Sequence, residues 1–108
     1  MLSVLLLLAG GAAAHDYPTV ERVQYVEACI RDHSDRQRQE MIYKCSCAID
    51  AIAQQMSYEQ FVEASTALYA GQVAGERGAA VRESSSGKEL ASAFRQAVRN
   101  AFRQCMIE

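Results

Sequence analysis

The chain has no tryptophan, a single proline and few aromatic side chains, which make up 7% of its 108 residues. No stretch of useful length alternates between apolar and polar residues, the pattern that predicts a half-buried β-strand. Half of the residues are nevertheless hydrophobic. A chain of this length has room for one domain, and we therefore expect one all-α domain with a helical core of Ala, Val, Leu and Ile.

Neither sign of charge is in large excess, because the formal net charge is −2. A strongly basic chain would indicate binding to nucleic acid or to an anionic membrane surface. The sequence therefore predicts no nucleic-acid partner, and any electrostatic binding site has to be local.

The first fourteen residues predict a secretory signal peptide. Leu2 to Ala9 is an apolar run too short to span a bilayer, and Ala12-Ala13-Ala14 supplies the A-x-A pattern of a cleavage site. No Lys or Arg precedes the run, so either translation starts upstream or the terminal amine supplies the positive charge. An uncleaved membrane anchor is the alternative. We expect cleavage after Ala14, a periplasmic or secreted domain of residues 15–108, and no stable membrane insertion after cleavage.

Apolar residues recur at helical spacing in four parts of the mature chain. The expected helices cover residues 19–31, 37–56, 58–70 and 87–106. The first has an expected apolar face of Val20, Val23, Val26, Cys29 and Ile30. Ser34, Ser57 and Ser86 are each followed at the third position by Gln or Glu, which predicts a capping box at a helix start. Residues 72–86 are irregular, and we expect a loop there or at most a short helical turn.

The chain has an even number of cysteines, namely Cys29, Cys45, Cys47 and Cys105. A domain of this size buries a modest fraction of its surface, and small exported domains are often stabilised by disulfides. We therefore expect two disulfides, for which three connectivities are possible.

Cys45 and Cys47 lie two residues apart in the second expected helix, so their side chains point about 200° apart. Cys45 falls at the centre of that helix's apolar face, and Cys105 at the centre of the last helix's apolar face. The favoured pairing is therefore Cys29–Cys47 with Cys45–Cys105. The alternative is Cys29–Cys45 with Cys47–Cys105. The diverging sulfurs also disfavour a shared zinc or copper ion and a redox role for the Cys45/Cys47 pair.

No combination of nucleophile, base and acid is evident in the sequence. The two histidines have no apparent serine or cysteine partner, and no two carboxylates stand out at catalytic spacing. We therefore expect no enzyme activity.

Arg95, Arg99 and Arg103 recur every four residues along the last expected helix, with Lys88 nearer its start. Like charges at this spacing destabilise an isolated helix by a few tenths of a kcal/mol per pair. The arginines therefore face carboxylates of another helix, are simply solvated, or form a contact surface for an acidic partner.

Cleavage after Ala14 would make His15 the first residue, and its α-amine and imidazole together suit copper(II). His33, the only other histidine, would complete a copper-binding brace. His33 follows the first expected helix, roughly 18–20 Å from its start at 1.5 Å per residue, so His15 would have to fold back along that helix. The simpler interpretation is a frayed terminal His15 and a solvated His33.

The sequence thus favours a small, exported, non-enzymatic accessory protein without a cofactor, which binds another exported protein through Arg95, Arg99 and Arg103. Two alternatives stay open. One is a periplasmic copper-binding protein that uses His15. The other is a carrier of a lipid or another apolar ligand between the helices, where the amphipathic rings of the tyrosines mark either a groove or the edge of the core. These tyrosines are Tyr25, Tyr43, Tyr58 and Tyr69.

The intact mass of the exported protein tests the predicted signal peptide. We expect a chain that begins at His15, because the A-x-A pattern ends at Ala14. A different first residue removes the copper brace, and an uncleaved N-terminus contradicts the signal peptide.

Overall fold

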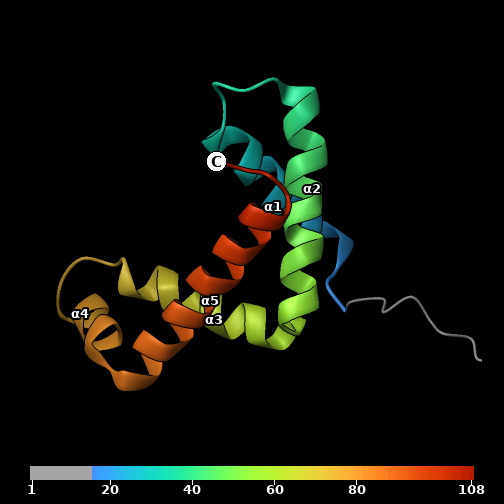
Figure 1. Ribbon diagram of the computed structural model, residues 1–108. Coiled ribbons are helices and arrows are strands. Elements are labelled where there is room, and N and C mark those ends of the chain that lie inside the picture. The colour runs from blue at the N-terminus through green and yellow to red at the C-terminus, as the bar shows by residue number, and fades with distance from the viewer. Residues whose placement is uncertain (1–15) are drawn as a thin grey trace, which may run out of the picture.

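The computed structural model describes residues 16–108, so the predicted signal peptide and His15 lie outside the described residues. Five α-helices and no strand make up the described part of the chain (Figure 1). They are α1 (Thr19–Asp32), α2 (Arg38–Gln55), α3 (Tyr58–Gly71), α4 (Glu76–Glu83) and α5 (Ser85–Gln104). The prediction of an all-α domain with two disulfides is confirmed.

Helix α4 is an addition to the four expected helices. It lies in the stretch expected to be irregular and begins after Gly75, whose φ of 89° favours glycine. One predicted capping box is confirmed, between Ser57 and Gln60, but α2 begins without a side-chain cap. The hydroxyl that caps α5 belongs to Ser84, which accepts a hydrogen bond from the Gly87 N–H at 3.0 Å. Helix α5 therefore begins two residues earlier than expected.

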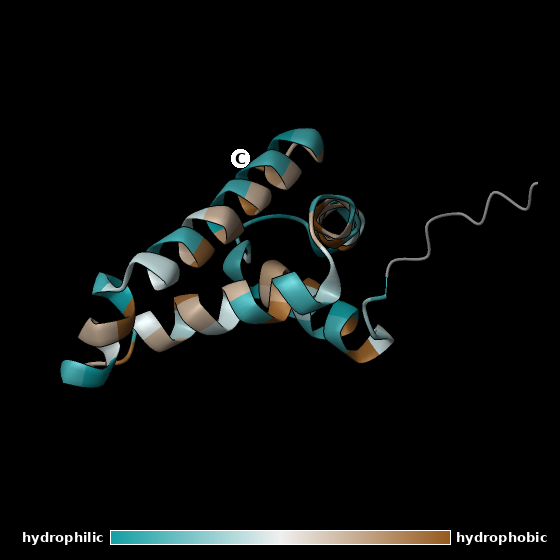
Figure 2. Cartoon of the chain, turned by 90° about the horizontal axis from the view of Figure 1, so that it is seen from below, coloured by the Kyte–Doolittle hydropathy of each residue, from teal (hydrophilic) through white to brown (hydrophobic). Residues whose placement is uncertain are grey.

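The helices are arranged around α2 and α5. Helix α2 packs against α1 and α5, and α5 also packs against α3 and α4. Figure 1 shows α4 at the end of the molecule away from α2, where it joins α3 to α5. Figure 2 shows hydrophobic and hydrophilic residues interspersed along the helices.

The core forms on the apolar face of α2. Met41, Cys45, Ile49 and Ile52 are the largest side chains that are fully buried. They follow one another at intervals of three or four residues and therefore share one face of the helix. Burial of apolar side chains of this size stabilises the folded state by about 1.5–3 kcal/mol each.

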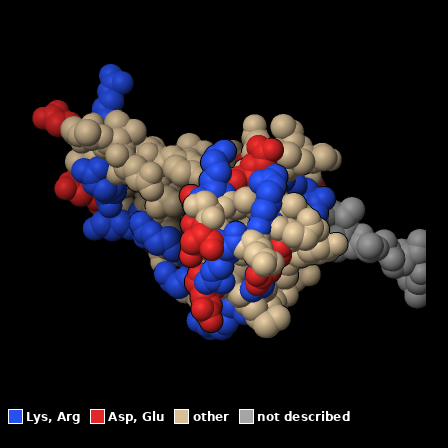
Figure 3. All heavy atoms as spheres, turned by 90° about the horizontal axis from the view of Figure 1, so that it is seen from above, with Lys and Arg blue, Asp and Glu red and all other residues tan. Residues whose placement is uncertain are grey.

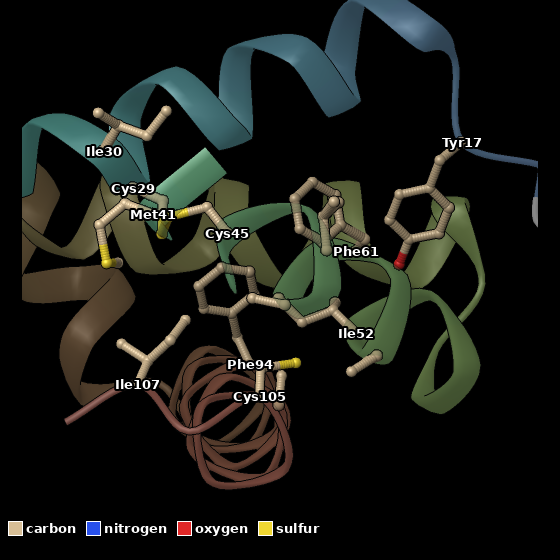
Figure 4. Packing of buried hydrophobic residues seen from close by; sticks show 14 of the residues in the cluster. Tyr17, Cys29, Ile30, Met41, Cys45, Ile52, Phe61, Phe94, Cys105 and Ile107 are labelled. Carbon is tan, nitrogen blue, oxygen red and sulfur yellow. A yellow bond between two sulfur atoms is a disulfide. The ribbon is translucent and has the colours of Figure 1, made fainter. Parts of the chain in front are cut away.

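Tyr17, just before α1, connects the N-terminal segment to the core. Its hydroxyl donates a hydrogen bond to the Met56 carbonyl at 3.0 Å, and its ring centroid lies 5.2 Å from that of Phe61. The Phe61 and Phe94 centroids are 5.7 Å apart, and the Phe61 ring lies between the other two (Figure 4). Asp16 accepts a hydrogen bond at 3.1 Å from the first N–H of α3, at the positive end of the helix dipole. These contacts hold the start of α1 against the junction of α2 and α3.

The two disulfides join α2 to α1 and to α5. They are Cys29–Cys45 and Cys47–Cys105. The favoured pairing of Cys29 with Cys47 and Cys45 with Cys105 is therefore wrong, and the alternative pairing is the one the structure contains.

The reason for the error is the side of α2 on which α5 packs. Cys47, Ala51 and Gln55 follow one another at intervals of four residues, and α5 covers this side of α2 rather than the face centred on Cys45. Ala51 is buried, and the Gln55 amide donates to the Ala97 carbonyl of α5 at 3.0 Å. The small alanine side chains let the two helices approach, whereas the sequence pattern favoured the face with more apolar area. Helix α1 takes the Cys45 face instead.

Counting free thiols in cysteine variants tests the pairing. The double variant Cys29→Ala/Cys45→Ala removes one complete disulfide, so we expect no free thiol by alkylation and mass spectrometry. Cys29→Ala/Cys47→Ala removes one partner from each bond and should leave two reactive thiols. Two free thiols in Cys29→Ala/Cys45→Ala and none in Cys29→Ala/Cys47→Ala would instead support the pairing of Cys29 with Cys47 and of Cys45 with Cys105.

Candidate functional site

Arg95, Arg99 and Arg103 lie on one side of α5, and all three are exposed. We call them the arginine stripe. The Arg99 guanidinium donates to the Gln96 side-chain oxygen at 2.8 Å, within the same helix. No carboxylate among residues 16–108 forms an ion pair with any of the three. Within this range, the arginine stripe therefore has no acidic partner and faces solvent.

The arginine stripe adjoins a hollow of about 550 Å³ between α3, α4 and α5, which we call the cationic hollow. Its lining includes Arg82, Lys88 and Arg95 and no carboxylate. The Arg82 guanidinium is fixed by hydrogen bonds to the carbonyls of Gly71 at 2.5 Å and Val73 at 3.2 Å. Figure 3 shows Lys and Arg atoms in a row along one edge of this end of the molecule. The hollow therefore extends the positive charge of the arginine stripe.

A second hollow, of about 400 Å³, lies between α1 on one side and α3 and α5 on the other. We call it the aromatic groove, because five of the eight Phe and Tyr side chains of the chain line it. These five are Tyr25, Phe61, Tyr69, Phe94 and Phe102. The groove exists because α1 packs on α2 and leaves its other side facing α3 and α5.

The aromatic groove carries negative charge. Glu21 and Asp32 line it, and no Lys or Arg does. The two carboxylates lie on the same face of α1, roughly 16 Å apart along the helix axis at 1.5 Å per residue. Tyr25 lies between these two carboxylates in the sequence of α1. Burial raises the pKa of its phenol to about 12, with smaller contributions from Tyr69 and Asp32. The groove and the cationic hollow therefore differ in charge as well as in shape.

His33 lies just after α1 and is half-buried at the edge of the aromatic groove. Its Nδ1 is 2.8 Å from the Cys29 carbonyl oxygen, which can only accept, so Nδ1 carries the proton and donates. Its ring meets the Phe102 ring edge-on at 5.9 Å between centroids. His15, the other half of the predicted copper site, lies outside the described residues. Within residues 16–108, no three side chains of His, Cys, Asp or Glu come together in a way that suits a metal ion.

The sequence predicted the arginine stripe but not the position of either hollow. Two of the four tyrosines that mark either a groove or the edge of the core, Tyr25 and Tyr69, do line the aromatic groove. The available signal for the groove was the spacing of Glu21, Tyr25 and Asp32 along α1, at intervals of four and seven residues, which places them on one helix face. The expected apolar face of this helix included Val20 and Val23, which are 63% and 51% exposed. For the cationic hollow there was no signal, because α4 was not expected as a helix.

No known protein family matches the chain, and no curated protein or solved structure matches it either. In the part of the chain that the structure describes, no helix is long and apolar enough to cross a membrane. The proposed function therefore rests on the chemistry of the two charged surfaces.

Alkaline titration tests the environment of Tyr25. Burial raises the pKa values of Tyr17 and Tyr25 to about 12 from an ordinary value of 10.0. The folded state thus holds these protons more tightly than the unfolded chain. The contribution of these two phenols to the free energy of unfolding is therefore fully present below pH 10 and is lost as the pH rises from about 10 to about 12.

Ultraviolet difference absorbance should therefore show at least two phenols that ionise late, and Tyr25→Phe should remove one of them. If the variant keeps the same number of late phenols, Tyr25 is not shielded in the way the structure indicates.

Proposed function

We propose that this protein is a small, exported, non-enzymatic accessory protein that binds an acidic surface of another exported protein through the arginine stripe. The observation that carries the proposal is the exposed arginine stripe, which has no carboxylate partner within residues 16–108. A solvated stripe is common on helix surfaces, but here the positive charge continues into the cationic hollow.

Electrostatics supports an acidic partner. The repulsion between arginines four residues apart costs the isolated helix a few tenths of a kcal/mol per pair. A guanidinium binds a carboxylate in bidentate geometry, and such charge-assisted hydrogen bonds are roughly twice as strong as neutral ones. Carboxylates of a partner would therefore relieve the repulsion and fix the orientation of the complex. Complementary charge also speeds association.

Two observations support the non-enzymatic character. Each of the four cysteines is in a disulfide, so no free thiol nucleophile is present in the described residues. His33, the one histidine in that range, has its Nδ1 proton bound to a backbone carbonyl and its ring against Phe102. The proposed export agrees with the disulfides, which persist in oxidising compartments.

Charge reversal tests the proposal. We expect Arg95→Glu/Arg99→Glu to weaken binding of the partner by about 30-fold or more, since breaking charge pairs at an interface costs about 2 kcal/mol or more. The matched control is Arg31→Glu/Arg77→Glu, which makes the same change of charge at exposed arginines on α1 and α4.

The measurement is capture of partners from a periplasmic or secreted fraction by the tagged protein, followed by titration of the captured protein. Both variants should unfold within about 0.5 kcal/mol of the wild type, as surface substitutions usually do. A partner set unchanged by Arg95→Glu/Arg99→Glu, or equally reduced by the control, would falsify the proposed surface.

A further inference from the structure

We propose that the aromatic groove binds a small organic cation, either a quaternary ammonium ion or a protonated alkylamine with an apolar part. This site lies between α1 and the α3/α5 pair, with different residues from those of the arginine stripe and the cationic hollow. It does not rest on the function proposed above.

The rings of the groove are arranged from its floor to its rim. Phe61 and Phe94 are buried, with 4% and 8% of their surface exposed, whereas Tyr69 is 63% exposed. The Tyr25 and Phe102 rings are half-buried between these extremes. The face of an aromatic ring attracts a cation within about 6 Å, and the attraction grows where water is excluded. A cationic head group that enters the groove would therefore meet several rings and lose only part of its solvent.

The charges that line the groove also favour an organic cation. The chain has 11 Lys and Arg residues, yet none lines the groove, while the carboxylates of Glu21 and Asp32 do. Asp32 is exposed, and its carboxylate forms no ion pair within residues 16–108. The arginines of the stripe lie on the adjacent side of α5 and outside the lining of the groove. An anion would meet the repulsion of these two carboxylates, with no Lys or Arg in the lining to offset it.

The size of the groove indicates a small molecule rather than a protein segment. Its volume of about 400 Å³ falls within the roughly 300–1,000 Å³ typical of small-molecule sites. Two features restrain its walls before any ligand binds. The Cys29–Cys45 disulfide ties α1 to α2, and the Phe61 and Phe94 rings pack together at 5.7 Å between centroids. Such preorganisation lowers the entropic cost of binding.

Three probes with the same six-carbon chain and different head charges test the proposal. They are hexyltrimethylammonium, 1-hexanol and hexyl sulfate, each titrated into the full exported protein by calorimetry or by NMR of the Tyr and Phe ring signals. We expect the cation to bind about tenfold more tightly than the alcohol, and the sulfate to bind most weakly. Equal affinity for the three probes, or no binding of the cation, would overturn the proposal.

Variants then assign the binding to the groove. Glu21→Gln/Asp32→Asn should weaken hexyltrimethylammonium about threefold and leave 1-hexanol almost unchanged, since the two carboxylates lie too far apart for one head group to contact both and an exposed charge contributes little. The matched control, Asp35→Asn/Glu83→Gln, neutralises two exposed carboxylates elsewhere and should have little effect. An equal loss in the control would show that net charge, and not the groove, attracts the cation.

A ring at the rim provides a second test that does not threaten the fold. Because Tyr69 is largely exposed, Tyr69→Leu should stay folded by circular dichroism and bind the cation about three- to fivefold more weakly. Tyr43→Leu, at an exposed tyrosine of α2, is its control. Arg95→Glu/Arg99→Glu should bind hexyltrimethylammonium no more weakly than the wild type, which separates this site from the partner surface. Unchanged affinity in Tyr69→Leu would contradict the role of the rings.

Discussion

Two disulfides attach α2 covalently to α1 and to α5, and they hold the other helices around it. The two disulfides close chain separations of 16 and 58 residues, which the chain-entropy account converts to about 3 and about 4 kcal/mol of stability. Small domains have a net stability of about 5–15 kcal/mol. The domain has no tryptophan and few large aromatic side chains. The two disulfides that link α2 to its neighbours therefore supply a large share of its stability.

The same bonds determine where the surfaces form. Cys45 holds α1 on one face of α2, and Cys47 holds the end of α5 on another. Helix α1 is thereby kept apart from α3 and α5, and the space between them becomes the aromatic groove. Helix α5 in turn packs on α3 and α4, so that one of its sides stays exposed and carries the arginine stripe. Neither surface contains the cysteine pair, but both depend on its geometry.

The net charge of the chain is close to zero, but two local surfaces carry charge of opposite sign. The cationic hollow contains Arg82, Lys88 and Arg95 and no carboxylate, and the aromatic groove contains Glu21 and Asp32 and no Lys or Arg. The two hollows share no lining residue, so each presents its own sign of charge to a ligand. These are the two surfaces for which we propose an acidic protein partner and an organic cation.

The helical fold, the presence of two disulfides and the alignment of Arg95, Arg99 and Arg103 could be predicted from the sequence, because they follow from periodicity and composition, which are local properties. The sequence did not predict which helix covers which face of α2. The apolar face around Cys45 pointed to α5, but the structure places α5 on the Cys47–Ala51–Gln55 side and α1 on the Cys45 face. Which helix covers which face of α2 depends on how several helices pack at once. This arrangement decided the pairing of the cysteines and the position of the aromatic groove, and it left Val20 and Val23 exposed.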